Sequence, residues 1–103
     1  MNLASIPSGD DVRMALQSVM DPELGLSVVD LGLVVKVEAE SGALMVGLAQ
    51  TSPVCPHGEA MRREVHATLT LAFPGIASTV VLLPEFPWHS GMMTPDAKAI
   101  LGW

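Results

Sequence analysis

The 103-residue chain has one cysteine, which limits what its thiol chemistry can be. A single cysteine cannot form a disulfide within the chain. It also cannot supply the four thiolates of a closed metal site. Any metal bound through this thiol must therefore take its other ligands from elsewhere.

Positive charge is also scarce in the sequence. Five lysines and arginines stand against eleven aspartates and glutamates, giving a formal net charge of -6 at pH 7. The few basic residues are dispersed along the chain. A nucleic-acid surface or a polybasic membrane patch is therefore not expected.

Long apolar segments are absent, although half of the residues are apolar. The apolar runs are too short and too interrupted to span a bilayer. Residues 1–7 do not combine a basic region with an apolar stretch, so no signal peptide is indicated and a reducing cytoplasm is the expected location. The length predicts one domain over residues 1–103, with residues 1–8 as a flexible N-terminus.

The first predicted element is a helix over residues 9–20. Ser8 and Asp11 have the spacing of a capping box. One apolar stripe has helical spacing: Val12, Ala15, Leu16, Val19 and Met20. Asp21-Pro22 is expected to end the helix, because the residue before proline disfavours the helical conformation.

The next apolar stretch predicts a long strand over residues 27–40, followed by a tight turn and an antiparallel strand over residues 43–50. Gly32 interrupts the first strand. A glycine within a strand pattern indicates a bulge or the close approach of another backbone. Asp30 beside it needs a hydrogen-bond partner if it is buried.

Helical spacing returns up to Ala72, followed by a strand over residues 76–83 and a final helix over residues 94–101 capped by Thr94 with Pro95 next. A strand–helix–strand connection of this length allows a parallel crossover. The predicted fold is α+β in two layers, in the order α-β-β-α-β-α. It has a mixed three-stranded sheet, two helices on one face and a short C-terminal helix.

Cys55 is the main candidate for chemistry. Prolines flank it at Pro53 and Pro56, and proline suits the first position of a helix. Either Ser52 or Cys55 is therefore the predicted N-cap, which places the sulfur in or beside the first turn. The helix dipole there would favour a thiolate. The competing interpretation is a buried cysteine that only packs.

The remaining candidate ligands show no diagnostic spacing. Asp21 and Glu23 fit a helix stop and a turn with solvated acids. We expect His57 to face solvent in the first turn and Glu59 to serve the helix dipole. His89 fits a surface or capping histidine better than a metal ligand, and Trp88 and Trp103 are expected to be packing anchors.

Several separated segments together resemble the SufT/PaaD-like iron–sulfur cluster assembly domain, from about Val12 to Trp103. They are Asp21-Pro22-Glu23, Val29-Asp30-Leu31-Gly32-Leu33, Thr51 with Cys55-Pro56 and Glu59, Pro87-Trp88 with Met92-Met93, and Leu101-Gly102-Trp103. The resemblance implies a small α/β domain that takes part in maturation of iron–sulfur proteins. It makes Cys55 the key thiol, with Asp21, Glu23, Thr51 and Glu59 as auxiliary cofactor-binding candidates and His57 and His89 as auxiliary metal ligands.

Three departures from the family pattern bear on its role. Val54 stands where glycine is more usual, and Glu85-Phe86 precede Pro87-Trp88 where the family often has Asp-Pro. The cysteine-rich C-terminal extension typical of PaaD-type proteins does not follow Trp103. A general assembly role is therefore favoured over an accessory role for a multicomponent aromatic-degradation oxygenase.

Three mechanisms remain open at this point. In the first, Cys55 transiently holds iron or an iron–sulfur cluster, with further ligands from a homodimer partner, from an iron–sulfur client or assembly protein, or from a small thiol. In the second, the protein is an adaptor that binds no metal and docks clients through residues 84–93. A thiol enzyme ranks lowest, because no activating pair for Cys55 can be located in the sequence.

Overall fold

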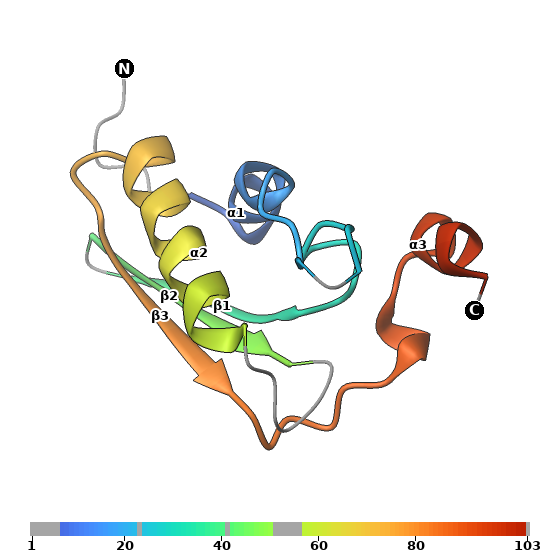
Figure 1. Ribbon diagram of the computed structural model, residues 1–103. Helices are drawn as coiled ribbons and strands as arrows, with labels where there is room; N and C mark the ends of the chain where they lie inside the picture. Colours follow the sequence, from blue (N-terminus) through green and yellow to red (C-terminus); the bar gives the residue numbers. More distant parts are fainter. Residues whose placement is uncertain (1–6, 23, 41, 51–56, 103) are drawn as a thin grey trace.

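The computed structural model describes residues 7–22, 24–40, 42–50 and 57–102, which form a sheet layer and a helix layer (Figure 1). The order of helices and strands confirms the predicted α-β-β-α-β-α arrangement, with one added 3-10 turn. In chain order the elements are α1 (Gly9–Leu16), β1 (Val34–Glu40), β2 (Ala43–Ala49), α2 (Gly58–Ala72), β3 (Ala77–Leu83), η1 (Ser90–Met92) and α3 (Pro95–Leu101).

The sheet is mixed, as the sequence predicts. Its strand order is β1-β2-β3. β1 pairs with β2 antiparallel, and β2 pairs with β3 parallel, with Val46 opposite Val80. The register shifts between Val34 and Lys36, so the irregularity of β1 lies near Val35 rather than at Gly32.

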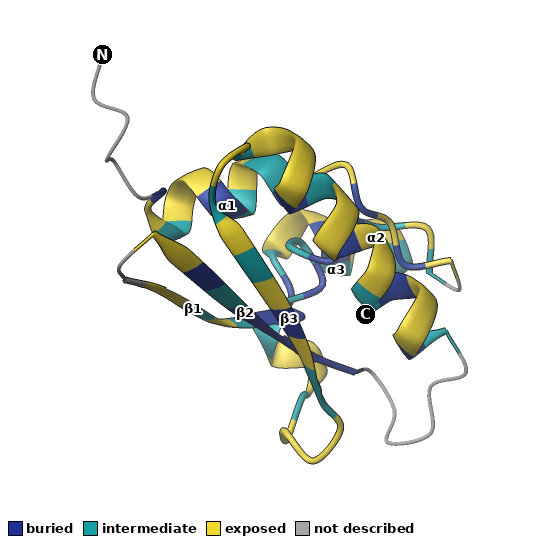
Figure 2. Cartoon of the chain, turned by 90° about the vertical axis from the view of Figure 1, so that its left-hand side faces the viewer, coloured by how far each residue is buried: buried dark blue, intermediate teal, exposed yellow. Residues whose placement is uncertain are grey.

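The core lies between the sheet and the two helices α1 and α2, which cover one face of it (Figures 1 and 2). Each element contributes residues at its own period, every second residue of β2 and every fourth residue of α1 and α2. These inward side chains are buried: Leu44, Val46 and Leu48 from β2, Met61, Val65 and Leu69 from α2, and Val12 and Leu16 from α1.

Helix α1 is shorter than predicted, because it ends at Leu16 instead of Met20. The chain after it runs beside residues 26–28: Asp21 N–H donates to Leu26 O at 2.9 Å, and Val28 N–H donates to Val19 O at 2.9 Å. These bonds replace the missing helical turn. Val19 is buried as predicted, but Met20 is 51% exposed.

The strand predicted over residues 27–40 is wrong for its first half. Residues 27–33 form turns, with Leu31 N–H donating to Ser27 O at 3.0 Å and Leu33 N–H to Val28 O at 2.9 Å. The apolar side chains in this stretch point into the core even so, and Leu31 and Leu33 are fully buried. Their burial produced a strand-like apolar run in a segment that lies outside β1.

Gly32 has a φ of +75°, and a Cβ on it would overlap the backbone carbonyl of Met92. The close approach of another backbone, one of the two predicted reasons for this glycine, is therefore confirmed. Only glycine combines this left-handed conformation with so near a neighbour at little cost.

Residues 84–102, here named the C-terminal arm, are fixed to the turns at residues 27–33. The Trp88 Nε1–H donates to Leu31 O at 2.8 Å, and Thr94 N–H donates to Asp30 O at 2.9 Å. Met93 is 4% exposed, and Trp88 packs against the core, which confirms it as a packing anchor. Trp103 lies outside the described residues.

The predicted caps of the first and last helices are confirmed. Ser8 Oγ accepts from Asp11 N–H, and Asp11 Oδ2 accepts from Ser8 N–H, both at 3.1 Å. Thr94 Oγ1 accepts from Ala97 N–H at 3.2 Å, and Pro95 takes the first position of α3. These two helix starts are specified by their own residues.

Candidate functional site

The start of α2 is the candidate site, because it directly follows the segment that carries Cys55. Helix α2 begins at Gly58 with His57 as its N-cap residue, so it begins later than the predicted starts at Pro53 or Pro56. The His57 side chain makes no capping hydrogen bond. Thr51, Cys55 and the prolines around Cys55 lie outside the described residues, as does Glu23.

The backbone donors at the start of helix α2 can be followed only to acceptors in the described residues. Met61 N–H donates to His57 O at 2.9 Å, which is the first bond of the helix. Within the described ranges, the N–H groups of Gly58, Glu59 and Ala60 have no acceptor. Such donors, aligned with the positive end of the helix dipole, favour an anion.

Gln50 is a largely buried polar residue beside the start of α2 that the sequence reasoning did not single out. It follows β2 and is only 9% exposed. A Cβ on Gly58 would overlap the Gln50 side-chain nitrogen and would lie 3.4 Å from Leu82 Cδ1. The amide therefore sits against the first residue of α2. A polar residue at the end of an otherwise apolar strand was the signal available in the sequence.

Asp21 is a buried structural residue, so the expectation of a solvated acid is wrong. It is 2% exposed, and its Oδ1 accepts from Leu24 N–H at 3.1 Å. Its carbonyl accepts from Gly25 N–H at 2.8 Å. These two bonds close the turn that follows Asp21, because an aspartate side chain can accept a hydrogen bond from the backbone a few residues further on.

Glu59 is exposed and engaged by its neighbour in the helix. Both carboxylate oxygens accept from Arg62 Nε, at 2.9 and 2.7 Å. The side-chain hydrogen bond from Arg62 lowers the pKa of Glu59 below its ordinary value of 4.5. The carboxylate is thus in the first turn, as predicted, and it is paired with a cation in addition to serving the dipole.

The two candidate histidines are placed by different elements. His57 is half-buried at the start of α2. His89 is exposed, and its Nδ1 accepts from Gly91 N–H at 3.1 Å, which confirms the capping interpretation. Among the described residues, no group of three His, Cys, Asp or Glu side chains is arranged to hold a metal ion.

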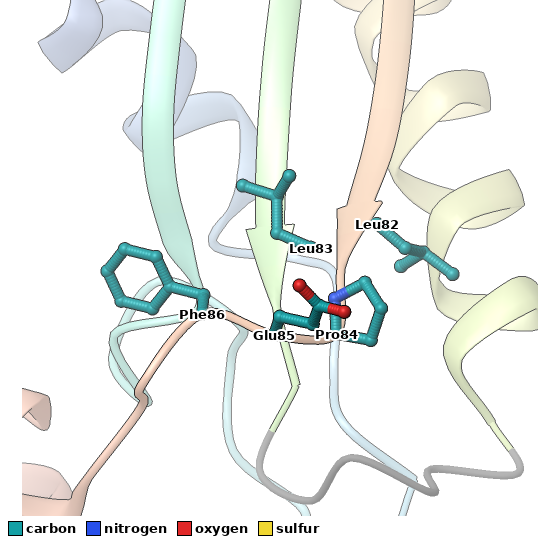
Figure 3. A pocket seen from close by; sticks show the side chains of 5 residues that line it. All are labelled: Leu82, Leu83, Pro84, Glu85 and Phe86. Carbon is teal, nitrogen blue, oxygen red and sulfur yellow. The ribbon is translucent and has the colours of Figure 1, made fainter.

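Two small cavities lie near these elements. One of about 210 Å³ is lined by Met20, Pro22, Ala60, Met61 and Glu64, between the turn after α1 and the first turns of α2. The other, of about 280 Å³, is lined by residues 82–86 (Figure 3). Leu82 points toward α2, whereas Leu83 points to the other side of the sheet.

Comparison with known proteins gives the family. A family model described as "Iron-sulfur cluster assembly protein" matches residues 9–83. The chain belongs to this family. Its match therefore includes α1, the whole sheet, α2 and the segment with Cys55.

Two curated relatives of this iron–sulfur cluster assembly family member extend the match over most of the chain. The Fe-S protein maturation auxiliary factor SufT of Staphylococcus aureus is 40% identical over 86 residues, covering 82% of this chain and 97% of the relative. The Fe-S protein maturation auxiliary factor YitW of Bacillus subtilis is 35% identical, covering 90% of this chain and 92% of the relative.

A solved structure shows the same fold. A domain of unknown function from Bacillus anthracis superposes with a TM-score of 0.84 at 30% identity, covering 90% of each chain. The fold of this family member is therefore found in an independently determined structure. No helix in the described part of the chain is long and apolar enough to cross a membrane.

The family membership explains why separated sequence segments resembled one pattern. The structure brings Leu31 and Gly32 against Trp88 and Met92, two segments nearly sixty residues apart, as the bond from Trp88 Nε1–H to Leu31 O shows. Asp21 holds the turn before them. These motif residues are thus joined by contacts within the described part of the chain.

Proposed function

We propose that the protein assists the maturation of iron–sulfur proteins in the cytoplasm as an assembly factor or carrier, without enzymatic activity. The observation that carries this proposal is the family match over residues 9–83, together with a relative of 40% identity named as an Fe-S protein maturation auxiliary factor. Iron or an iron–sulfur cluster is then the cargo, and iron–sulfur client or assembly proteins are the partners.

Cys55 is the proposed ligand of this cargo. It is the only thiol of the chain, and thiolates are the usual ligands of iron–sulfur clusters. Since one chain offers one thiolate, the remaining ligands would come from Cys55 of a second copy, from the client or from a small thiol. Ligation shared in this way suits transfer, because no single chain holds the cluster completely.

The other proposed ligands differ in availability. Asp21 already supports a turn, Glu59 pairs with Arg62, and His89 accepts the bond from Gly91 N–H. His57, at the N-cap of α2 without a capping bond, is the auxiliary ligand that its surroundings favour most. Thr51 and Glu23 stay proposals from the family resemblance.

Anaerobic reconstitution with iron and sulfide tests the proposal. We expect the wild type to develop a cluster absorption band with a dimer on sizing, and Cys55→Ser to lose both. His89→Gln is the matched control, because its capping role predicts an unchanged band. If neither the wild type nor the variants bind iron, the carrier role is wrong and an adaptor that docks clients without metal takes its place.

A further inference from the structure

The two edge strands of the sheet differ in how well they are protected against pairing with a further strand. β1 carries the side chains of Lys36 and Glu38, which pair at 3.8 Å, and its register shifts between Val34 and Lys36. Charged side chains and bulges on an edge strand hinder pairing with another chain. β3 has no charged residue, and its parallel pairing with β2 runs without a shift from Ala77 to Leu83. Of the two edges, β3 is therefore the one open to a partner strand.

β3 has a neighbouring strand on one side only within the described part of the chain (Figure 1). Helix α2 packs on one face of β3, where Val80 is buried. On the other face Thr79 and Val81 are exposed, Val81 to 40%. A regular edge strand without charges or proline is a template for pairing with another molecule. We therefore expect a strand from outside the chain to cover this edge.

The sequence of β3 indicates which strand fits. The three residues before Val80 have small side chains and the three after it have larger, apolar ones: Ala77, Ser78 and Thr79, then Val81, Leu82 and Leu83. A second copy of β3 related by a two-fold axis would run antiparallel to the first. With Val80 opposite its own copy, each smaller side chain would lie opposite a larger one. The strand is therefore complementary to itself.

The distribution of charge favours contact at β3 over contact elsewhere. With a formal net charge of -6, two copies of the chain repel one another, and salt screens this repulsion. Pairing along residues 77–83 brings no like charges directly opposite each other, an arrangement that would be destabilising between strands. Contact at this edge should therefore become stronger as salt is added.

We propose that two copies of the protein form a dimer without metal, by antiparallel pairing of their β3 strands about Val80. The two three-stranded sheets would then become one six-stranded sheet. A seven-residue strand pair is a small interface, so this dimer should form only in concentrated protein. A dimer bridged by a cluster, in contrast, should persist on dilution.

Analytical ultracentrifugation of metal-free Cys55→Ser tests this pairing separately from the proposed function, because the variant has no thiol to hold a cluster. Up to about 300 µM, a concentration suited to a small interface, we expect the mass to rise from 10.8 kDa toward twice that value, and more steeply in high salt. A mass that stays at that of one chain at every concentration would overturn the proposal. Failed cluster reconstitution would count against the carrier role only.

Charge exchange tests the register of the pair. In the Cys55→Ser background, Thr79→Glu/Val81→Glu would place carboxylates opposite each other across the two-fold axis, and we expect dimerisation to weaken by about a hundredfold or more. Thr79→Lys/Val81→Lys should weaken it similarly, and an equimolar mixture of the two variants should restore a dimer. A mixture that stays monomeric would overturn the proposed register.

The matched control for added charge lies on α3. Ala99 and Ile100 are both exposed, so Ala99→Glu/Ile100→Glu adds the same charge as the glutamate pair on β3 but away from that strand. This variant should dimerise like its Cys55→Ser parent. An equal loss of dimer in both glutamate variants would show that net charge, and not the β3 edge, controls association.

Hydrogen exchange gives a readout that needs no substitution in β3, and so holds even if the β3 variants fail to fold. In metal-free Cys55→Ser, we expect backbone amides within residues 77–83 to exchange more slowly in concentrated than in dilute protein. Amides of β1 should exchange equally at both concentrations. Slowing at β1 and not at β3 would place the contact on the wrong edge and overturn the proposal.

Discussion

The N-termini of α2 and α3 are built in opposite ways. Thr94 caps α3 with its side chain, Pro95 follows, and Thr94 N–H is itself bound to Asp30 O. Helix α2, the longest in the described residues, begins at Gly58, and its N-cap residue His57 makes no side-chain capping bond. Thr94 thus satisfies a first-turn donor of α3 with its own side chain, whereas His57 does not do so for α2.

The largest expected effect comes from a substitution at Gly32, where the backbone of Met92, shortly before α3, packs closely. In Gly32→Ala, the new Cβ would meet the Met92 carbonyl in a left-handed backbone, and we expect a loss of about 3 kcal/mol in the free energy of unfolding. Gly25→Ala is the control: its φ is +70°, but a Cβ there has nothing within 4 Å. Equal losses in urea denaturation would show that the Met92 contact is unimportant.

The hydrogen bond of Trp88 is the next test of how firmly the C-terminal arm is held. Trp88→Phe keeps an aromatic six-membered ring and leaves Leu31 O without its 2.8 Å donor. We expect a loss of about 1–2 kcal/mol in urea denaturation, the cost of an unpaired, partly buried carbonyl. A stability equal to wild type would mean that water replaces the indole freely.

Capping variants compare the helix starts directly. Thr94→Ala and Ser8→Ala should each cost about 1 kcal/mol, because each removes the acceptor for a first-turn N–H. His57→Ala should stay within about 0.5 kcal/mol of wild type, since His57 makes no capping bond. If His57→Ala cost as much as Thr94→Ala, the contrast between α2 and α3 would fail.

The smallest effect concerns Glu59 and the pH. Because Arg62 lowers the pKa of Glu59, the stabilisation is present above the ordinary value of 4.5 and is lost as the pH falls through the lowered pKa. Wild type should therefore be slightly more stable than Glu59→Gln at neutral pH, and the two should converge in acid. A difference that grows on acidification would reverse the sign of this interaction.

Local patterns were enough to predict much of the fold. The capping residues Ser8 and Thr94 act within one helical turn, so their effect is visible in the sequence. Alternation and helical spacing gave the order of elements and the mixed sheet. The family resemblance also came from the sequence, and it is confirmed over residues 9–83.

Contacts between distant residues decided what local patterns could not. Residues 27–33 have the composition of a strand, yet their backbone bonds close turns within the segment, and the C-terminal arm bonds to the carbonyls of Leu31 and Asp30. Asp21 looked like a solvated acid, and the turn it holds buries it. Gln50 is likewise buried by tertiary contacts that its local sequence does not show. The sequence predicts Cys55 as the key thiol, and it did not single out Gln50, because only tertiary packing places the Gln50 side chain against Gly58.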